Sequence, residues 1–149
     1  MDDKDLKKIL ELILNKIKNE KIVWRLDGSS NLKIQGMNVT INDLDITTNE
    51  EGQKIFKEKL KEYVQKHHYS KKINGNTLIC KINNFEVEIN VYGDREKEYF
   101  EDIKKIKWQG LIVPIMPLAQ AKEFYERIGR DEKVELINKH ENKENKVKL

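Results

Sequence analysis

Cysteine, proline and long apolar runs are scarce in this chain of 149 residues. Its one cysteine, Cys80, has no partner for an internal disulfide, which is typical of a protein of the reducing cytoplasm. No stretch approaches the roughly 20 consecutive apolar residues of a membrane-spanning helix. The acidic start Met1-Asp2-Asp3 lacks the basic and apolar regions of a signal peptide. We therefore expect a cytoplasmic protein with no membrane partner.

An excess of charge of one sign is also lacking. Lys and Arg together number 29 and Asp and Glu number 26, for a net charge of +3. This balance gives no strong case for nucleic acid or membrane as the partner. The length fits one domain with a core of its own. We treat residues 1–149 as a single domain, with residues 141–149 expected to fray because they are polar and terminal.

Apolar periodicity predicts an alternation of helices and strands. The expected helices cover residues 4–18, 50–66, 117–128 and 131–139, with a short helix within 29–37 and partly helical structure in 94–106. The expected strands cover residues 22–26, 42–47, 77–82, 85–92 and 110–115. Asn83-Asn84 supplies a two-residue hairpin turn, since Asn tolerates positive φ. The fold class is therefore α/β or α+β, with a mixed β-sheet and helices packed against it.

Acidic side chains alternate with apolar ones in two of the expected strands. Asp43 and Asp45 are two residues apart, so their carboxylates share one face of a strand. Glu86 and Glu88 follow the same rule in a later strand. If the two strands are neighbours, three carboxylates converge, a set able to hold two divalent metal ions with a preference for magnesium. The alternative is that each strand presents a solvated acidic face.

A short polar segment, Gly28-Ser29-Ser30, follows an expected strand and opens an expected helix. Glycine lets the backbone approach a ligand closely. The N–H groups at a helix start favour phosphate, and Ser29 adds a hydroxyl donor. The alternative is a turn with a helix N-cap and no ligand.

These segments form the pattern of a known family. Gly28-Ser29 is followed, after thirteen residues, by Asp43-Leu44-Asp45, and Glu88 supplies a later acid in a strand. The sequence resembles the nucleotidyltransferase superfamily related to DNA polymerase beta, and most of all its small branch of aminoglycoside and lincosamide nucleotidyltransferases. We prefer Glu88 over Glu86 because Glu88-Ile89-Asn90-Val91 matches the acid, hydrophobic, polar, hydrophobic run of that branch.

The resemblance implies the nucleotidyltransferase fold with C-terminal helices, and a magnesium-dependent reaction. A nucleoside monophosphate would pass from a nucleoside triphosphate such as ATP to a hydroxyl acceptor, with release of pyrophosphate. Asp43, Asp45 and Glu88 would be the catalytic residues and the ligands of two Mg²⁺ ions. Glu88 would act as a second-metal ligand or as the general base.

The resemblance also implies a nucleotide site. Gly28, Ser29 and Ser30 would hold the triphosphate, and Arg25 and Arg130 are candidate phosphate contacts. Either arginine is also explained as an ordinary surface charge.

The acceptor and the assembly stay open at this level. The acceptor could be a small molecule, a protein or an RNA end, and a homodimer could complete the pocket of so short a chain. The rival function is a nucleotide-binding regulatory protein, such as an antitoxin of the minimal nucleotidyltransferase type. His67-His68 is placed near the end of the helix 50–66, where a positive charge is favourable.

Overall fold

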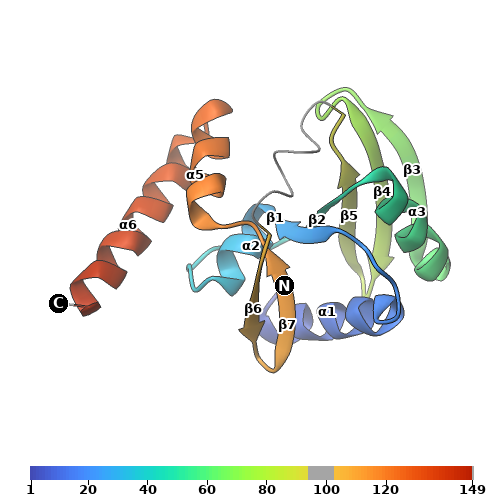
Figure 1. Cartoon of the computed structure of the whole chain (residues 1–149), viewed down its shortest axis with the longest axis horizontal. Helices are drawn as coiled ribbons and strands as arrows, with labels where there is room; N and C mark the ends of the chain where they lie inside the picture. Colours follow the sequence, from blue (N-terminus) through green and yellow to red (C-terminus); the bar gives the residue numbers. More distant parts are fainter. Residues whose placement is uncertain (94–102, 149) are drawn as a thin grey trace.

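A five-stranded mixed sheet is the main element of the protein, whose computed structural model describes residues 1–93 and 103–148 (Figure 1). The strand order is β1-β2-β5-β4-β3. Only β2 and β5 are parallel neighbours, and the other neighbouring pairs are antiparallel. The predicted mixed sheet is confirmed. Its strands are β1 (Trp24–Asp27), β2 (Leu44–Thr48), β3 (Val64–Ser70), β4 (Gly75–Ile82) and β5 (Phe85–Val91).

Two helices cover one face of this sheet. They are α1 (Asp3–Ile17) and α3 (Glu50–Lys59). The predicted apolar stripe of α1 is buried, and Asp2 and Asp5 form a capping box at its start. The fully buried core includes residues from both helices and from the facing side of the strands, among them Leu10, Phe56 and Ile89. Burial of this face leaves the opposite, polar face of the sheet available for a site.

A hairpin of two further strands lies beside β1. It comprises β6 (Lys104–Trp108) and β7 (Leu111–Ile115), and β7 contacts β1. Residues 104–106 were expected to be partly helical and are instead in β6, because pairing with β7 satisfies their backbone groups. The rest of that expectation, residues 94–102, lies outside the described residues.

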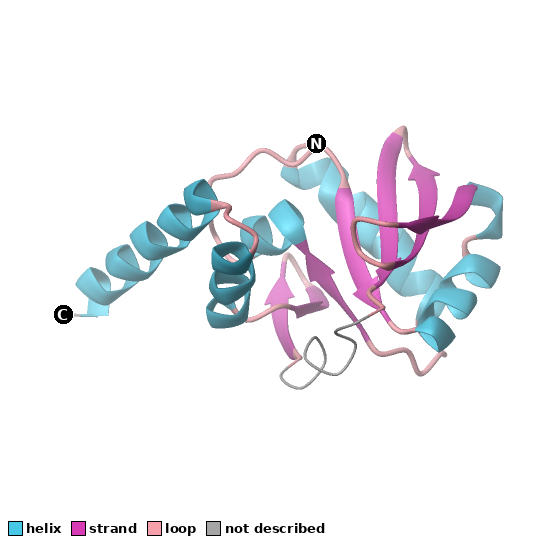
Figure 2. Cartoon of the chain, turned by 90° about the horizontal axis from the view of Figure 1, so that it is seen from above, coloured by secondary structure: helices cyan, strands magenta, loops and turns pink. Residues whose placement is uncertain are grey.

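The C-terminal helices form an arm at one end of the molecule (Figures 1 and 2). They are α5 (Leu118–Arg127) and α6 (Asp131–Lys148), and they pack with α2 (Gly28–Ile34) in a second apolar cluster. Pro117 precedes α5 and Gly129 follows it at a φ of +74°, as predicted. The last helix is longer than the predicted 131–139, because α6 continues to Lys148 with no Gly or Pro to stop it. No described helix is long and apolar enough to cross a membrane.

The predicted helix 50–66 is too long. The helix α3 ends at Lys59, a short 3-10 turn η1 (Lys61–Tyr63) follows, and β3 begins at Val64. Residues after Val64 pair with β4, and that ladder replaces the helical hydrogen bonds. His67 and His68 therefore lie in a strand, where neighbours point to opposite faces.

Candidate active site

Three carboxylates lie in a row across three neighbouring strands of the polar sheet face. In the strand register, Asp27 is opposite Asp45, and Asp45 is opposite Glu88. Their apolar chain neighbours Leu44 and Val87 are fully buried on the core side. The alternation predicted from the sequence thus has its physical cause in the core, which fixes the register and turns every second side chain toward the polar face.

Glu88 is the centre of the acidic group. It lies opposite Asp45 in the β2–β5 pairing, and its charge raises the pKa of the Asp45 carboxyl group. Oxygens of Asp43, Glu86 and Glu88 also lie within 4.8 Å of one another. Asp43 comes just before β2, at the edge of the same face. Hard oxygen donors so close together are the set that Mg²⁺ prefers, so the residues present fit a divalent ion.

The charge of Asp45 is costly in the protein without a metal ion. Burial, and then the neighbouring charges of Glu88 and Asp27, raise the pKa of Asp45 to about 8. The ionised form of Asp45 is therefore disfavoured, and a divalent cation between Asp45 and Glu88 would remove the repulsion.

The turn from β1 into α2 is built around Gly28. Its φ of +59° suits glycine, and a Cβ at this position would overlap Oδ2 of Asp45. Asp27 Oδ1 accepts the Gly28 N–H at 3.0 Å, and Asp27 Oδ2 accepts the Thr47 hydroxyl at 2.8 Å. Burial raises the pKa of Asp27, while Arg25 and these donors oppose the shift. The turn and the carboxylate row are therefore a single packed unit.

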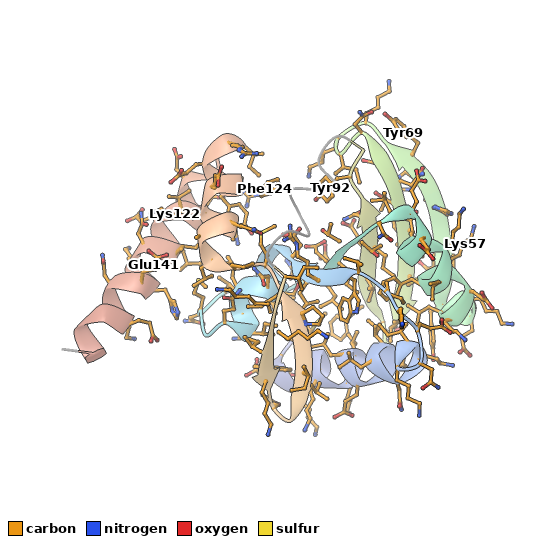
Figure 3. The ribbon with its side chains drawn as sticks, viewed as in Figure 1. Lys57, Tyr69, Tyr92, Lys122, Phe124 and Glu141 are labelled. Atoms are coloured by element: carbon orange, nitrogen blue, oxygen red, sulfur yellow. The ribbon has the colours of Figure 1, made fainter. Side chains whose placement is uncertain are left out.

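A cleft of about 380 Å³ opens over this unit. Its floor is the polar sheet face, and its other wall comes from α5, from α6 and from the loop between them. Figure 3 labels Tyr92 and Phe124, which line the cleft from the end of β5 and from α5 respectively. Lys133 Nζ on α6 lies 3.1 Å from Ser29 Oγ, so the arm meets the Gly28 turn directly.

The structure brings only some of the predicted site residues into the cleft. Gly28, Ser29, Asp45, Glu88 and Arg130 line it.

Three others lie outside the lining. Asp43 stands at the edge with Glu86. Ser30 is fully buried, and its hydroxyl donates to the Asp27 carbonyl at 2.8 Å. Arg25 is fully buried as well and donates to Gln120 Oε1 on α5 at 3.0 Å, so it is not a surface charge.

Sequence reasoning missed several lining residues. Asp27 was not singled out, although its place at the end of a strand beside Gly28 could have indicated a further acid. Lys133 lies on a helix far along the chain, and no spacing rule connects it to Ser29. His68 was assigned to a helix end, and its strand position became visible only through the pairing of β3 with β4.

Known proteins of similar sequence and structure agree with the resemblance seen in the sequence. The family model for aminoglycoside-2''-adenylyltransferase matches residues 9–144. A search of the curated proteins finds no sequence match. Among solved structures, a candidate nucleotidyltransferase from Thermotoga maritima is 26% identical with a TM-score of 0.74, and the alignment covers 96% of each chain.

Two antibiotic-modifying enzymes share the fold. ANT(2'')-Ia in complex with adenylyl-2''-tobramycin is 11% identical with a TM-score of 0.62, over 95% of this chain and 92% of that one. The lincosamide adenylyltransferase LnuA with bound lincomycin is 13% identical with a TM-score of 0.61, over 93% of this chain and 97% of that one. The predicted nucleotidyltransferase fold is confirmed.

Proposed function

The chain belongs to the aminoglycoside-2''-adenylyltransferase family, and from this membership we propose that it transfers a nucleoside monophosphate from a nucleoside triphosphate to a hydroxyl acceptor. The observation that carries the proposal is the carboxylate row beside Gly28. Asp45 and Glu88 are register neighbours, both line the cleft, and Gly28 is in contact distance of Asp45.

Asp43, Asp45 and Glu88 are the proposed ligands of two Mg²⁺ ions. Bound magnesium supplies charge neutralisation for the triphosphate and for the leaving pyrophosphate. The raised pKa of Asp45 supports this role. It shows that the ionised carboxylate is unfavourable in its buried, acidic surroundings, and a bound cation would stabilise it.

The chain's own residues hold the nucleotide and the proton. Gly28 and Ser29 are proposed to contact the triphosphate through the turn, with Lys133 and Arg130 facing it from the arm. The acceptor oxygen forms a bond to the α-phosphorus, the bond between that phosphorus and the α,β-bridging oxygen breaks, and pyrophosphate leaves. Glu88 accepts the proton of the acceptor hydroxyl. Positioning and charge neutralisation supply most of the catalysis.

The acceptor class is open at this stage. The two neighbouring structures contain adenylyl-2''-tobramycin and lincomycin respectively. Both are small hydroxyl compounds, so we propose a small-molecule acceptor ahead of a protein or an RNA end. The cleft volume of about 380 Å³ supports this order, since it falls in the range of small-ligand pockets.

The test is a transfer assay with each of the four labelled nucleoside triphosphates and magnesium. Wild type is compared with Asp45→Ala, and Glu58→Ala is the control because Glu58 is an exposed acid of α3, on the covered face of the sheet. We expect pyrophosphate release by wild type and by the control, with a loss of at least about a hundredfold in Asp45→Ala. Equal release by all three proteins rejects the site. Magnesium-dependent nucleotide binding without any transfer supports the rival function, a regulatory or antitoxin-type protein.

A further inference from the structure

The arm begins at a buried backbone position where the β6–β7 ladder has ended. Met116 follows Ile115, the last residue of β7, and the final pair of that ladder is Lys104 with Ile115. Met116 is 2% exposed, so its backbone N–H and C=O are turned away from solvent. Buried backbone groups are almost always hydrogen-bonded. The partners of Met116 therefore come from outside the ladder.

A single side chain pairs with both of these backbone groups. Asn31 of α2 accepts the Met116 N–H through Oδ1 at 3.0 Å, and it donates from Nδ2 to the Met116 carbonyl at 2.9 Å. Gln35, one turn further along α2, donates to the same carbonyl at 2.8 Å and to Asn31 Oδ1 at 3.0 Å. Asn31 is 1% exposed. Its side-chain amide, a donor and an acceptor side by side, takes the place of a neighbouring strand.

These bonds fix the direction in which the arm leaves the rest of the molecule. Pro117 follows Met116, and α5 begins directly after it at Leu118. Two parallel hydrogen bonds set an orientation as well as a distance. Arg25 of β1 adds a second anchor, because it donates to Gln120 Oε1 in the first turn of α5 at 3.0 Å. The start of the arm is thereby tied to β1 and α2.

The helix that holds the arm also carries the Gly28 turn. Gly28 is the first residue of α2, and Asn31 follows within one helical turn. At the cleft, Lys133 of the arm returns to the Gly28 turn at Ser29 Oγ. A rotation of the arm at Met116 would move its whole contribution to the cleft lining, namely Phe124, Tyr125, Ile128, Arg130 and Lys133.

We propose that Asn31 is a positioning residue for nucleotide binding: its two hydrogen bonds to Met116 hold the arm where Lys133 and Arg130 reach the triphosphate. The proposal rests on the proposed function, because it takes the cleft as the nucleotide site. Asn31 is not among the described residues that line the cleft, so it acts through the arm. A residue that only stabilised the fold would change the amount of folded protein, whereas a positioning residue changes binding by the folded protein.

The test replaces Asn31 by leucine, which keeps the size of the side chain and removes both hydrogen bonds. Gln53→Leu is the matched control. Gln53 is a buried amide of α3 that also donates to two backbone carbonyls, those of Asn76 and Ile89. It lies at the opposite end of the molecule from the arm (Figure 1). Gln35→Met is a milder second variant, because Gln35 is half-buried and Asn31 keeps its own bonds to Met116.

The first measurement is the distance between the arm and the sheet, without nucleotide or magnesium. Spin labels at Lys81→Cys in β4 and Glu126→Cys in α5 report it by double electron–electron resonance. Both positions are exposed, and the native cysteine is fully buried. Since α5 has 10 residues, a rotation of about 15° at its start moves its other end by about 4 Å. We expect a change of this size in Asn31→Leu, a smaller change in Gln35→Met and the wild-type distance in Gln53→Leu.

The second measurement is the kinetics of transfer by the four proteins without labels. We expect Asn31→Leu to raise the KM for nucleotide about tenfold, as for one lost hydrogen bond to a charged group, and to keep kcat within about threefold of wild type. Gln53→Leu should keep the wild-type KM. A loss of folded protein alone would lower the apparent kcat and leave KM unchanged. Where Asn31→Leu does not fold, the same test applies to Gln35→Met, with a rise in KM of about threefold.

Three results would overturn the proposal. The arm distance could stay unchanged in Asn31→Leu, or it could change equally in Gln53→Leu, and either result shows that Asn31 does not set the position of the arm. A displaced arm with a wild-type KM would show that nucleotide binding does not depend on the arm. Failure of the proposed function is distinguishable, because wild type then neither transfers nor binds nucleotide with magnesium, whereas the arm distances need no nucleotide. If wild type binds nucleotide without transfer, the dissociation constant takes the place of KM.

Discussion

Gly28 and Asp45 are fitted to one another at the scale of single residues. The left-handed backbone of Gly28 and the place of Asp45 Oδ2 together exclude any side chain at position 28. We predict that Gly28→Ala lowers the free energy of unfolding by at least about 1–2 kcal/mol, the usual cost of a left-handed non-glycine residue. It also displaces Asp45, so magnesium-dependent nucleotide binding weakens. Urea unfolding and nucleotide titration measure the two effects.

Gly110 provides the matched control for this change. It also has a positive φ, +82°, but a Cβ there meets no atom within 4 Å. Gly110→Ala should show a comparable backbone cost and unchanged nucleotide binding. If both variants bind nucleotide as wild type does, the close approach of Gly28 to Asp45 has no functional meaning.

Glu88 and Glu86 share a strand and a face, and only Glu88 lines the cleft and contacts Asp45. We predict that Glu88→Gln lowers the transfer rate by about a hundredfold or more, as expected for loss of a general base or metal ligand. Glu86→Gln should stay within a few-fold of wild type. The measurement is the rate of pyrophosphate release by each variant under saturating nucleotide. A larger loss in Glu86→Gln than in Glu88→Gln would show that Glu86 is the third catalytic acid.

Among the described elements, β3 and the start of β6 are those whose type the sequence pattern did not predict, and β3 shows the reason most clearly. The helical spacing of residues 50–60 continues smoothly into the apolar Tyr63 and Val64, so nothing local marks the change to a strand. The pairing of His67 with Leu78 across the β3–β4 ladder decides it. Elements with a complete local signal, such as the apolar periodicity of α1 and the Asn83-Asn84 turn, were predicted correctly, and both asparagines have positive φ.

The same distinction applies to the candidate site. Strand alternation, a local rule, predicted that Asp43 and Asp45 share one face, whereas the pairing of β2 with β5, a tertiary contact, brings Glu88 opposite Asp45. Arg25 and Ser30 were predicted as ligand contacts and are instead fully buried, since tertiary contacts with Gln120 and with Asp27 determine their surroundings. Local sequence rules therefore predict the face on which a side chain lies, and tertiary packing determines how deeply it is buried.

His67 connects β3 to α3 and is expected to be sensitive to acid. Its Nδ1 faces Lys57 Nζ at 3.1 Å, and its Nε2 faces Gln53 Oε1 at 3.2 Å. Burial, and then the charges of Lys57 and His68, lower the pKa of His67 from its usual 6.5. The unfolded chain therefore takes up this proton first as the pH falls. The contribution to stability is present above pH 6.5 and is lost as the pH falls through the lower folded-state pKa.

We predict that His67→Gln reduces the loss of stability between pH 7.5 and pH 5, which are about one unit above and more than one unit below the usual histidine pKa. Glutamine keeps a polar group for Gln53 and has no proton to take up in this range. The measurement is the free energy of unfolding of wild type and of His67→Gln at the two pH values. Identical pH slopes would show that the His67 contacts are not linked to folding.

For the whole molecule, the arm formed by α5 and α6 closes the cleft over the sheet. The contact of Lys133 with Ser29 joins residues 104 positions apart in the chain. We predict that Lys133→Ala weakens triphosphate binding about tenfold, the worth of one hydrogen bond to a charged group. Lys139→Ala is the control, because Lys139 is exposed on the same helix and pairs with Glu135. Equal triphosphate affinities in the two variants would show that Lys133 of the arm does not contribute to nucleotide binding.

The central claim is that the carboxylate row binds nucleotide through a divalent cation. The most direct measurement is nucleotide affinity for ATP, CTP, GTP and UTP with magnesium and with a chelator, in wild type and in Asp45→Asn. Asparagine keeps the size of Asp45 and removes a buried charge, so the variant should fold. The account predicts that at least one nucleotide binds wild type only with magnesium and that Asp45→Asn loses this binding. Nucleotide affinity that is the same with and without magnesium, or the same in both proteins, would contradict it.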